Sequence, residues 1–262
     1  MISGASYNVF NGEEHLLHSL RVMRRNVDYI NIVVQFTSNL GLPASPALNE
    51  ALHAVISEKL VDEIHFYEPD LSIEPARNEI RKRSIGLDMA KRAAVSHFMT
   101  MDCDEYYPPS EFKAAKDFIV AEGVEATAVR TYLHIKRPIW RSKEPDVTCC
   151  SFLTRIGSDS QLTLGAPYPA LVDPTRRLFD GRQSFHMFDT AAITMRHMNL
   201  VRTDLSSKLA NSSNAHMVDF MRQVRAQYDA WTFGQDLLFP NKPPMEIVEV
   251  EDLFGIDRFF PQ

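Results

Sequence analysis

The stretch HFMTMDCDEYYPPSEF, residues 97–112, places an apolar run directly before a group of acidic side chains. Residues 97–101 have the composition of a buried strand. The acids that follow are Asp102, Asp104, Glu105 and Glu111. Carboxylates at the exit of a strand repel one another, so a turn, a metal ion or a charged ligand must compensate them.

Strand-like and helix-like segments alternate on the N-terminal side of this stretch. The predicted strands are 2–10, 29–36, 61–69 and 97–101, and the predicted helices are 11–27, 49–60 and 74–96. Asn11 is the expected cap of the first helix. Strands that alternate with helices predict a largely parallel sheet, in which ligands bind beyond the carboxyl ends of the strands. Asp102 lies at such an end.

The C-terminal side has longer connections that contain proline. The predicted strands are 125–140, 149–157, 191–201 and 245–254, and the predicted helices are 110–123, 202–213 and 215–231. Ser110 is the expected cap of the helix 110–123, and Gly123 is expected to end it. Because no linker separates the two sides, we expect one domain over residues 1–262.

Composition excludes several classes of protein. A net charge of -6 argues against general nucleic-acid binding, which needs a basic face. Cys103, Cys149 and Cys150 have neither a disulfide pattern nor a zinc spacing, which favours reduced thiols and a cytoplasmic location. The N-terminus has no secretory signal, and no apolar run approaches the roughly 20 residues of a membrane span. We expect a soluble protein that contacts membranes at most peripherally.

The Asp102-Cys103-Asp104 spacing allows two carboxylates to converge on one hard cation, directly or through its water. Mg²⁺ and Mn²⁺ prefer oxygen ligands and keep positions open for substrate phosphates. The alternative is that the acids only cap the turn and helix that follow. If the acids mainly repel one another, the substitution Asp104→Ala should leave the fold intact.

Three segments together resemble GT-A glycosyltransferases, particularly family two. They are RKRSIGLDMAKRAAVSHFMTMDCDEYY (81–107), YNVFNGEEHLLHSL (7–20) and TMRHMNLVRTDLSSKLANSS (194–213). The resemblance implies a GT-A-like, Rossmann-type α/β domain with a mainly parallel central sheet flanked by helices. It also implies a nucleotide-binding half (1–110) and an acceptor-binding, metal-completing half (111–262).

The same resemblance implies a metal-dependent hexosyl- or N-acetylhexosaminyltransferase. Its donor would be a nucleotide-sugar, UDP being favoured by family frequency, and its acceptor a glycan, a lipid-linked saccharide or another hydroxyl compound. The implied nucleotide-binding residues are Phe10, Asn11, Glu13, Gln35, Arg83 and Asp102. The implied ligands of Mn²⁺ or Mg²⁺ are Asp102, Asp104 and His197. Three of these residues also have a purely structural interpretation. Glu13 would only interact with its helix dipole, Arg83 would be a solvated charge on a helix face, and His197 would be a structural histidine at a strand end.

The sequence departs from the family where many relatives carry a His-Glu pair. This chain has Phe185-His186-Met187-Phe188-Asp189 there. Inverting transfer needs a carboxylate base, for which Asp189 is the first candidate and Asp173 the second. The alternative for Asp189 is a turn before the strand 191–201, and the stereochemistry stays open.

Acceptor binding is predicted in the stretch TYLHIKRPIWRSKEP, residues 131–145, through Tyr132 and Trp140. Aromatic faces beside arginines suit a sugar. The alternative is a half-buried strand whose long side chains reach solvent.

Two other functions remain open. A haloacid-dehalogenase-like phosphatase also uses an Asp-x-Asp motif with Mg²⁺, but normally on its first strand. A non-catalytic binding module could keep the fold without the reaction. A sugar-nucleotide pyrophosphorylase would need a Gly-rich basic N-terminal loop, which GASYNVFNGEE (4–14) is not.

Overall fold

The N-terminal half of the chain forms a parallel sheet whose strand order reverses at β1. The computed structural model describes residues 1–179, 181, 183–212 and 215–260. Its parallel strands are β1 (Ser3–Val9), β2 (Tyr29–Val34), β3 (Glu63–Phe66) and β4 (His97–Asp102), in the spatial order β3-β2-β1-β4. The chain proceeds outward from β1 to β3 and then returns to the other side of β1. Loops therefore diverge between the carboxyl ends of β1 and β4, which is where such sheets bind ligands.

Mostly antiparallel strands extend this sheet beyond β4. They are β5 (Glu105–Tyr106), β6 (Ala126–Ile135), β7 (Arg137–Ser142), β8 (Cys150–Arg155), β9 (Phe185–Met187), β10 (Thr194–Leu200) and β11 (Ile247–Glu249). The predicted strand 125–140 is two strands, because Lys136 has a φ of 57° and turns the chain between β6 and β7. The short strands β5 and β9 were not predicted. The predicted α/β class is confirmed, with parallel pairing concentrated in the first half.

The described residues contain helices on both faces of the sheet. They are α1 (Glu13–Met23), α2 (Ala47–Ser57), α3 (Pro75–Arg92), α4 (Pro109–Glu122), α5 (Leu205–Ala210) and α6 (Val218–Ala230), with short 3-10 turns η1 (Pro174–Arg176) and η2 (Asp257–Phe259). Two predicted caps are wrong. Gly12, not Asn11, precedes α1, and Pro108, not Ser110, precedes α4. Gly123 ends α4 in the left-handed conformation, as predicted.

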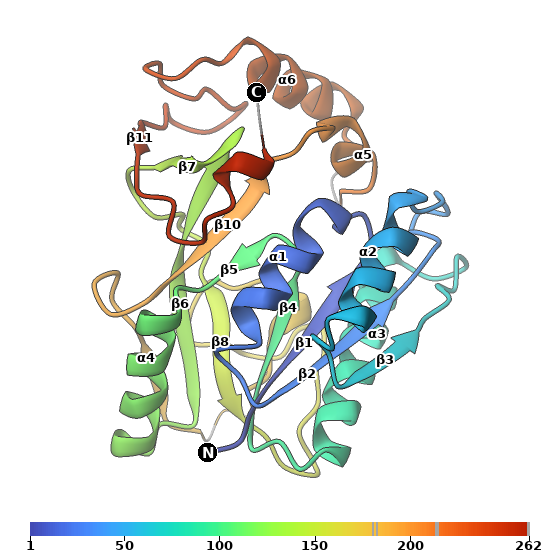
Figure 1. Ribbon diagram of the computed structural model, residues 1–262, viewed down its shortest axis with the longest axis vertical. Helices are drawn as coiled ribbons and strands as arrows, with labels where there is room; N and C mark the ends of the chain where they lie inside the picture. The colour runs from blue at the N-terminus through green and yellow to red at the C-terminus, as the bar shows by residue number, and fades with distance from the viewer. Residues whose placement is uncertain (180, 182, 213–214, 261–262) are drawn as a thin grey trace.

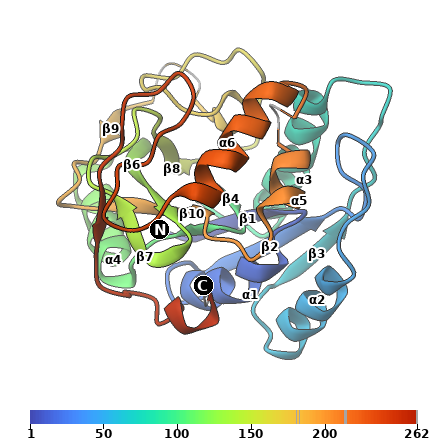
Figure 2. The same ribbon diagram turned by 90° about the horizontal axis from the view of Figure 1, so that it is seen from above.

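Alternation along β1 assigns its two faces to different helices. Ala5, Tyr7 and Val9 belong to the large apolar core that also includes residues of α1 and α2. The opposite face meets α3, where a Cβ on Gly86 would lie 1.8 Å from the Ser6 hydroxyl oxygen. Only glycine allows this close approach of helix and strand. Figure 1 and Figure 2 show the resulting layers, with the sheet between the helices.

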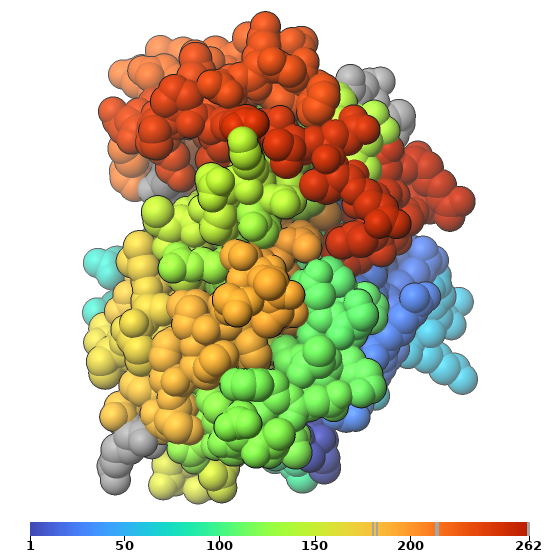
Figure 3. Space-filling model, turned by 90° about the vertical axis from the view of Figure 1, so that its left-hand side faces the viewer, coloured from blue at the N-terminus to red at the C-terminus, as the bar shows by residue number. Residues whose placement is uncertain are grey.

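The C-terminal part of the chain covers the end of the sheet at which the parallel strands finish. Figure 1 shows α5 and α6 above β1 and β4, and Figure 3 shows the C-terminal segments in orange and red at that end. Helix α6 packs against β7 through an apolar cluster that includes Trp140, Tyr228 and Trp231. None of the helices in the described ranges is long and apolar enough to cross a membrane.

Buried His134 in β6 gives a testable pH dependence of stability. Its Nδ1 lies 2.7 Å from the Pro138 carbonyl oxygen, which can only accept, so Nδ1 carries a proton. Burial lowers the pKa of His134 to about 3. Because this pKa is below the ordinary value, the unfolded chain takes up a proton on His134 at a higher pH than the folded protein does. The contribution of neutral His134 to the free energy of unfolding is therefore complete above pH ~6.5 and is lost as the pH falls toward the folded-state pKa.

We expect His134 alone to lower the free energy of unfolding by about 2 kcal/mol between pH 7 and pH 5. Asparagine can replace the Nδ1–H donor but does not titrate. Urea unfolding of His134→Asn at both pH values should therefore show a decrease smaller by about that amount. An unchanged decrease would contradict the neutral buried state of His134.

Candidate functional site

A cavity of about 1080 Å³ opens where β1 and β4 end. We call it the large cavity. Of the residues predicted to bind nucleotide, Phe10, Asn11, Gln35, Arg83 and Asp102 line it, as does Asp104. Glu13 is not among the lining residues and lies in the first turn of α1. The strand reversal therefore brings together side chains from β1, β2, α3 and β4.

The turn between β1 and α1 packs directly on the acidic turn after β4. Asn11 has a φ of 51°, in the left-handed region that asparagine tolerates better than most residues. A Cβ on Gly12 would lie 2.5 Å from the Cys103 Cβ, so no larger residue fits there without displacing Cys103. Glycine at position 12 thus allows the two turns to meet at the cavity.

The negative charge of Asp102 is neutralised by two arginines from distant parts of the chain. Oδ1 accepts a hydrogen bond of 3.1 Å from Arg83, and Oδ2 accepts one from Arg176 of η1. Arg176 also donates to Glu105, at 2.9 and 2.6 Å. Burial by itself would raise the pKa of Asp102, but Arg176 and Arg83 outweigh it and hold that pKa well below the ordinary value. Asp102 therefore remains ionised throughout the neutral range.

Asp104 is more deeply buried, with 2% of its side chain exposed, and it too is paired with cations. Its Oδ2 accepts hydrogen bonds from Arg202 at 2.5 Å and from Lys208 at 2.9 Å. Burial would raise the pKa of Asp104, yet Lys208 and Arg202 hold it far below the ordinary value. The premise that Asp104→Ala would relieve repulsion between unpaired acids does not hold, because Asp104 is paired with Arg202 and Lys208 and its removal would leave the buried guanidinium of Arg202 without a carboxylate partner.

One oxygen of Asp104 fits a metal ion. Oδ1 is buried without a hydrogen-bond partner and lies 3.7 Å from Nε2 of His197. A carboxylate oxygen and an imidazole nitrogen at that separation can both ligate Mn²⁺ or Mg²⁺. Asp102 fits less well, because arginines occupy both of its oxygens. In the described ranges no three or more His, Cys, Asp or Glu side chains gather as a metal site, so the predicted triad is not preassembled.

A second cavity of about 560 Å³ adjoins the large cavity. It lies between β6, β8 and β10 on one side and α5 and α6 on the other. Residues that line both cavities are Asp102, Asp173, Asn199, Lys208 and Ser212. The two cavities therefore meet beside the Asp102 carboxylate, and His197 lines the second one.

Asp173 stands at this junction, immediately before η1. Its Oδ1 accepts hydrogen bonds of 2.8 Å from the backbone N–H and the hydroxyl of Thr175. Its side chain is 45% exposed, and Oδ2 lies 3.9 Å from Nε of Arg176. Burial raises the pKa of Asp173, but Arg83, Arg176 and the bonds to Thr175 outweigh it and lower the pKa overall. Asp173 thus offers an ionised oxygen to both cavities.

Asp189 lies elsewhere. It is exposed in the turn before β10, and its Oδ1 accepts hydrogen bonds of 2.9 Å from the backbone N–H groups of Ala191 and Ala192. Neither cavity includes it among its lining residues. Its position matches the turn interpretation, and of the two predicted bases Asp173 is the one near Asp102.

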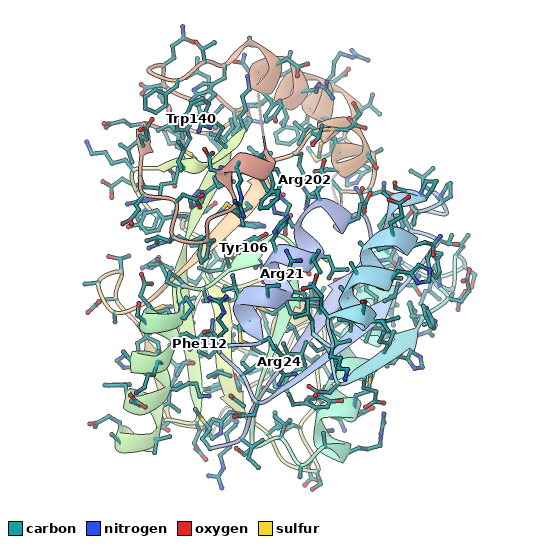
Figure 4. All side chains as sticks on the ribbon, viewed as in Figure 1. Arg21, Arg24, Tyr106, Phe112, Trp140 and Arg202 are labelled. Carbon is teal, nitrogen blue, oxygen red and sulfur yellow. The ribbon has the colours of Figure 1, made fainter. Side chains whose placement is uncertain are left out.

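Neither aromatic residue predicted to bind the acceptor lines either of the two cavities described above. Thr131 and Leu133 line the second cavity, and side chains alternate along a strand, so Tyr132 of β6 faces the other way. The Arg141 guanidinium lies 3.8 Å from the centre of the Tyr132 ring. Trp140 stacks on Phe233, and Figure 4 shows it apart from Arg202, on the side formed by β7 and β11. Their acceptor role stays a prediction without support from their positions.

Four charged side chains that pair with Arg83 or with the acids at the cavities were not assigned from sequence. Arg202 and Lys208 fell inside the resembling segment 194–213, but their charges were given no role. Arg176 lies in PTRRLF, residues 174–179, where nothing distinguishes it from a surface arginine. Glu79, which pairs with Arg83 at 2.9 Å, occupies a helix position one turn before it. The i,i+4 spacing of Glu79 and Arg83 was the one available signal.

Comparisons with known proteins give no family. No protein-family model matches the sequence, and no curated protein matches it. Among solved structures, S. aureus TarS 1–349 in complex with UDP-GlcNAc is similar at a TM-score of 0.38 and 12% identity, over 51% of this chain and 35% of that chain. GalNAc-T7 with UDP, GalNAc and Mn²⁺ is similar at a TM-score of 0.42 and 12% identity, over 89% of this chain and 52% of that chain.

A third similar structure is mannose-1-phosphate geranyltransferase from Thermus thermophilus, with a TM-score of 0.28 and 9% identity. It matches over 58% of this chain and 50% of that chain. This chain spans less than two thirds of the length of each of the three structures. Because the TM-scores are low, we derive nothing about the function of this chain from them.

Proposed function

We propose that the chain transfers a sugar from a nucleotide-sugar to a hydroxyl group of an acceptor. The observation that carries this proposal is the meeting of two cavities at Asp102 and Asp173. A transfer reaction needs separate places for two substrates whose reacting atoms touch. The resemblance of segments 7–20, 81–107 and 194–213 to GT-A glycosyltransferases points to the same chemistry.

The donor would occupy the large cavity. Lys82, Arg83, Arg202 and Lys208 line this cavity and bring positive charge to a site otherwise marked by carboxylates. A diphosphate bound among them would share these cations with Asp102 and Asp104. Mn²⁺ or Mg²⁺, held by Asp104 and His197, would supply further positive charge for the leaving diphosphate.

The acceptor hydroxyl would lie at the junction of the cavities, near Asp173. Its oxygen forms a bond to the anomeric carbon while the bond from that carbon to the diphosphate oxygen breaks, and the electron pair leaves with the diphosphate. The hydroxyl proton passes to the Asp173 carboxylate. A lowered pKa makes Asp173 a weak base in the free protein. Negative charge of a donor bound beside Arg83 in the large cavity would raise that pKa toward the working range.

The phosphatase alternative is disfavoured by the environment of the two aspartates. A nucleophilic carboxylate needs a free oxygen directed at the phosphorus atom. Both oxygens of Asp102 accept hydrogen bonds from arginines, and the one oxygen of Asp104 without a hydrogen-bond partner, Oδ1, is itself buried. Hydrolysis of a simple phosphomonoester would also leave the second cavity without a role.

The deciding experiment is thermal denaturation with a panel of nucleoside diphosphates, each with and without Mn²⁺. We expect one nucleotide, UDP being the first candidate, to raise the melting temperature more with Mn²⁺ than without. The variant His197→Gln should weaken the metal-dependent binding about 10–100-fold, as measured by titration calorimetry.

The matched control is His53→Gln, which changes an exposed histidine on α2 outside both cavities. It should bind like the unsubstituted protein. If no nucleoside diphosphate stabilises the protein, the proposed donor is wrong. If His197→Gln and His53→Gln behave alike, His197 is not a metal ligand.

A further inference from the structure

The second cavity has a strand wall of mixed character, which includes Leu133 and Met195, and a largely apolar wall opposite. Strand and loop residues contribute hydroxyl and amide groups, among them Thr131, Thr148 and Asn199. Opposite them lie apolar side chains of the C-terminal region, among them Leu209, Phe220, Met221, Val224 and Phe239. The volume of about 560 Å³ is within the range of about 300–1,000 Å³ typical of small-molecule sites.

Only part of the apolar wall belongs to the packed core, since Leu209 and Phe239 pack against the cluster between α6 and β7 and Val224 is buried. Phe220, Met221 and Val224 are spaced so that they share one face of α6. Phe220 and Met221 are only half-buried and do not belong to the apolar cluster that fastens α6 to β7. Their side chains instead line the cavity. A ligand that covers them would gain about 25 cal/mol for each Å² of apolar surface removed from water.

The charged groups around this cavity are matched with one another. Asp146 and Lys242 lie 4.0 Å apart, and Arg176 is paired with Glu105 and Asp102. Lys208 is held by Asp104 at 2.9 Å. An anionic acceptor would have to compete for cations that already have carboxylate partners, and it would approach Asp173 and Glu105. The cavity therefore favours an uncharged ligand.

From the two walls and the matched charges we infer that the acceptor is an uncharged hydroxyl compound that carries an apolar group, such as an aryl or alkyl glycoside. This inference rests on the proposed transfer reaction and specifies its second substrate. The hydroxyl and amide groups of the strand wall bind hydroxyl groups, and the apolar group covers the α6 face that includes Phe220. One hydroxyl then lies toward Asp173 and the large cavity, where it takes the anomeric carbon from the diphosphate and gives its proton to Asp173.

The test compares acceptor binding in the absence of a donor. The probes are phenyl and methyl β-D-glycosides of glucose, galactose and N-acetylglucosamine, together with phenyl β-D-glucuronide as an anionic probe. Dissociation constants are measured by ligand-observed NMR. For at least one sugar we expect the phenyl glycoside to bind about tenfold more tightly than the methyl glycoside, and the glucuronide to bind more weakly than the phenyl glucoside.

The substitution Phe220→Ser should reduce the preference for phenyl over methyl about three- to tenfold. Val218→Ser is the matched control, because Val218 is on the same helix, is 61% exposed and lines neither cavity. It should keep the full preference. Both substitutions replace exposed or half-buried side chains, so both variants should fold, which circular dichroism checks.

Equal binding of every phenyl and methyl pair would overturn the inference, as would a preference that survives Phe220→Ser. Stronger binding of the glucuronide would overturn the uncharged class. Nucleotide binding is measured separately on the same samples. Nucleotide binding without a Phe220-dependent preference contradicts this inference alone, whereas that preference without any nucleotide binding contradicts the proposed transfer and leaves the cavity's ligand class supported.

Discussion

Replacement of Asp173 by asparagine is expected to lower the turnover number of sugar transfer about 10²–10⁴-fold. Asparagine cannot take the acceptor proton at neutral pH, but its Oδ1 can still accept the two hydrogen bonds from Thr175 that shape η1. Donor binding should therefore change little. The measurement is single-turnover transfer at saturating donor, with the donor dissociation constant determined in parallel.

Asp189→Asn is the control for this prediction, because Asp189 is the other carboxylate first considered as the base. In the structure it holds a turn before β10. Asparagine should preserve that turn and leave turnover nearly normal. If Asp189→Asn loses turnover while Asp173→Asn does not, the assignment must be reversed. If both variants remain active, the leaving diphosphate itself accepts the proton, as in a retaining reaction.

The substitution Asp104→Ala is expected to lower the free energy of unfolding by about 3–5 kcal/mol. It removes the carboxylate that pairs with Arg202, whose own side chain is 4% exposed and cannot reach water without rearrangement. Lys208 is less affected, since 31% of its side chain is already exposed and it can turn to solvent. Chemical denaturation at neutral pH measures the loss.

A second substitution, at Arg202, tests whether the loss of stability in Asp104→Ala comes from the unpaired buried charge. In Asp104→Ala/Arg202→Met the unpaired guanidinium is gone, so the double variant should be more stable than Asp104→Ala alone. Asp117→Ala on α4 is the control for an exposed pair, because Asp117 and Lys113 are both mostly solvent-exposed. It should change stability by less than about 1 kcal/mol. A fully stable Asp104→Ala would mean that Arg202 finds another partner.

Residues of the site differ in how far local sequence could identify them. Asp102 and Asp104 follow an apolar strand, and that local context predicted a ligand site at the end of the sheet, where both residues line the large cavity. Phe10, Asn11 and Gln35 were assigned only through the resemblance to GT-A glycosyltransferases, and all three line the large cavity. Tyr132 and Trp140 were chosen for composition alone, and only the register of β6 shows that Thr131 and Leu133 face the cavity instead.

The negative charges of Asp102 and Asp104 are neutralised by arginines that only the tertiary structure brings close to them. Arg176 is 74 residues from Asp102 and Arg202 is 98 residues from Asp104. The first hydrogen-bonded pair is partly buried and the second is buried. Nothing in the local pattern around either arginine distinguishes it from a solvated one. The repulsion between the acids was visible in the sequence, but the groups that relieve it depend on how η1 and the segment after β10 return to the end of β4.

The sequence by itself determined the alternation of strands and helices up to Asp102, because apolar periodicity follows from which side chains each element must bury. That alternation also determined which strand ends carry the acids, and hence predicted a ligand site beyond them. Only the tertiary structure decided which cations neutralise Asp102 and Asp104, that a second cavity adjoins the first, and that Asp173 rather than Asp189 stands between them. These features depend on contacts between segments far apart in the chain, and such contacts are set by packing and loop geometry that no local pattern of residues encodes.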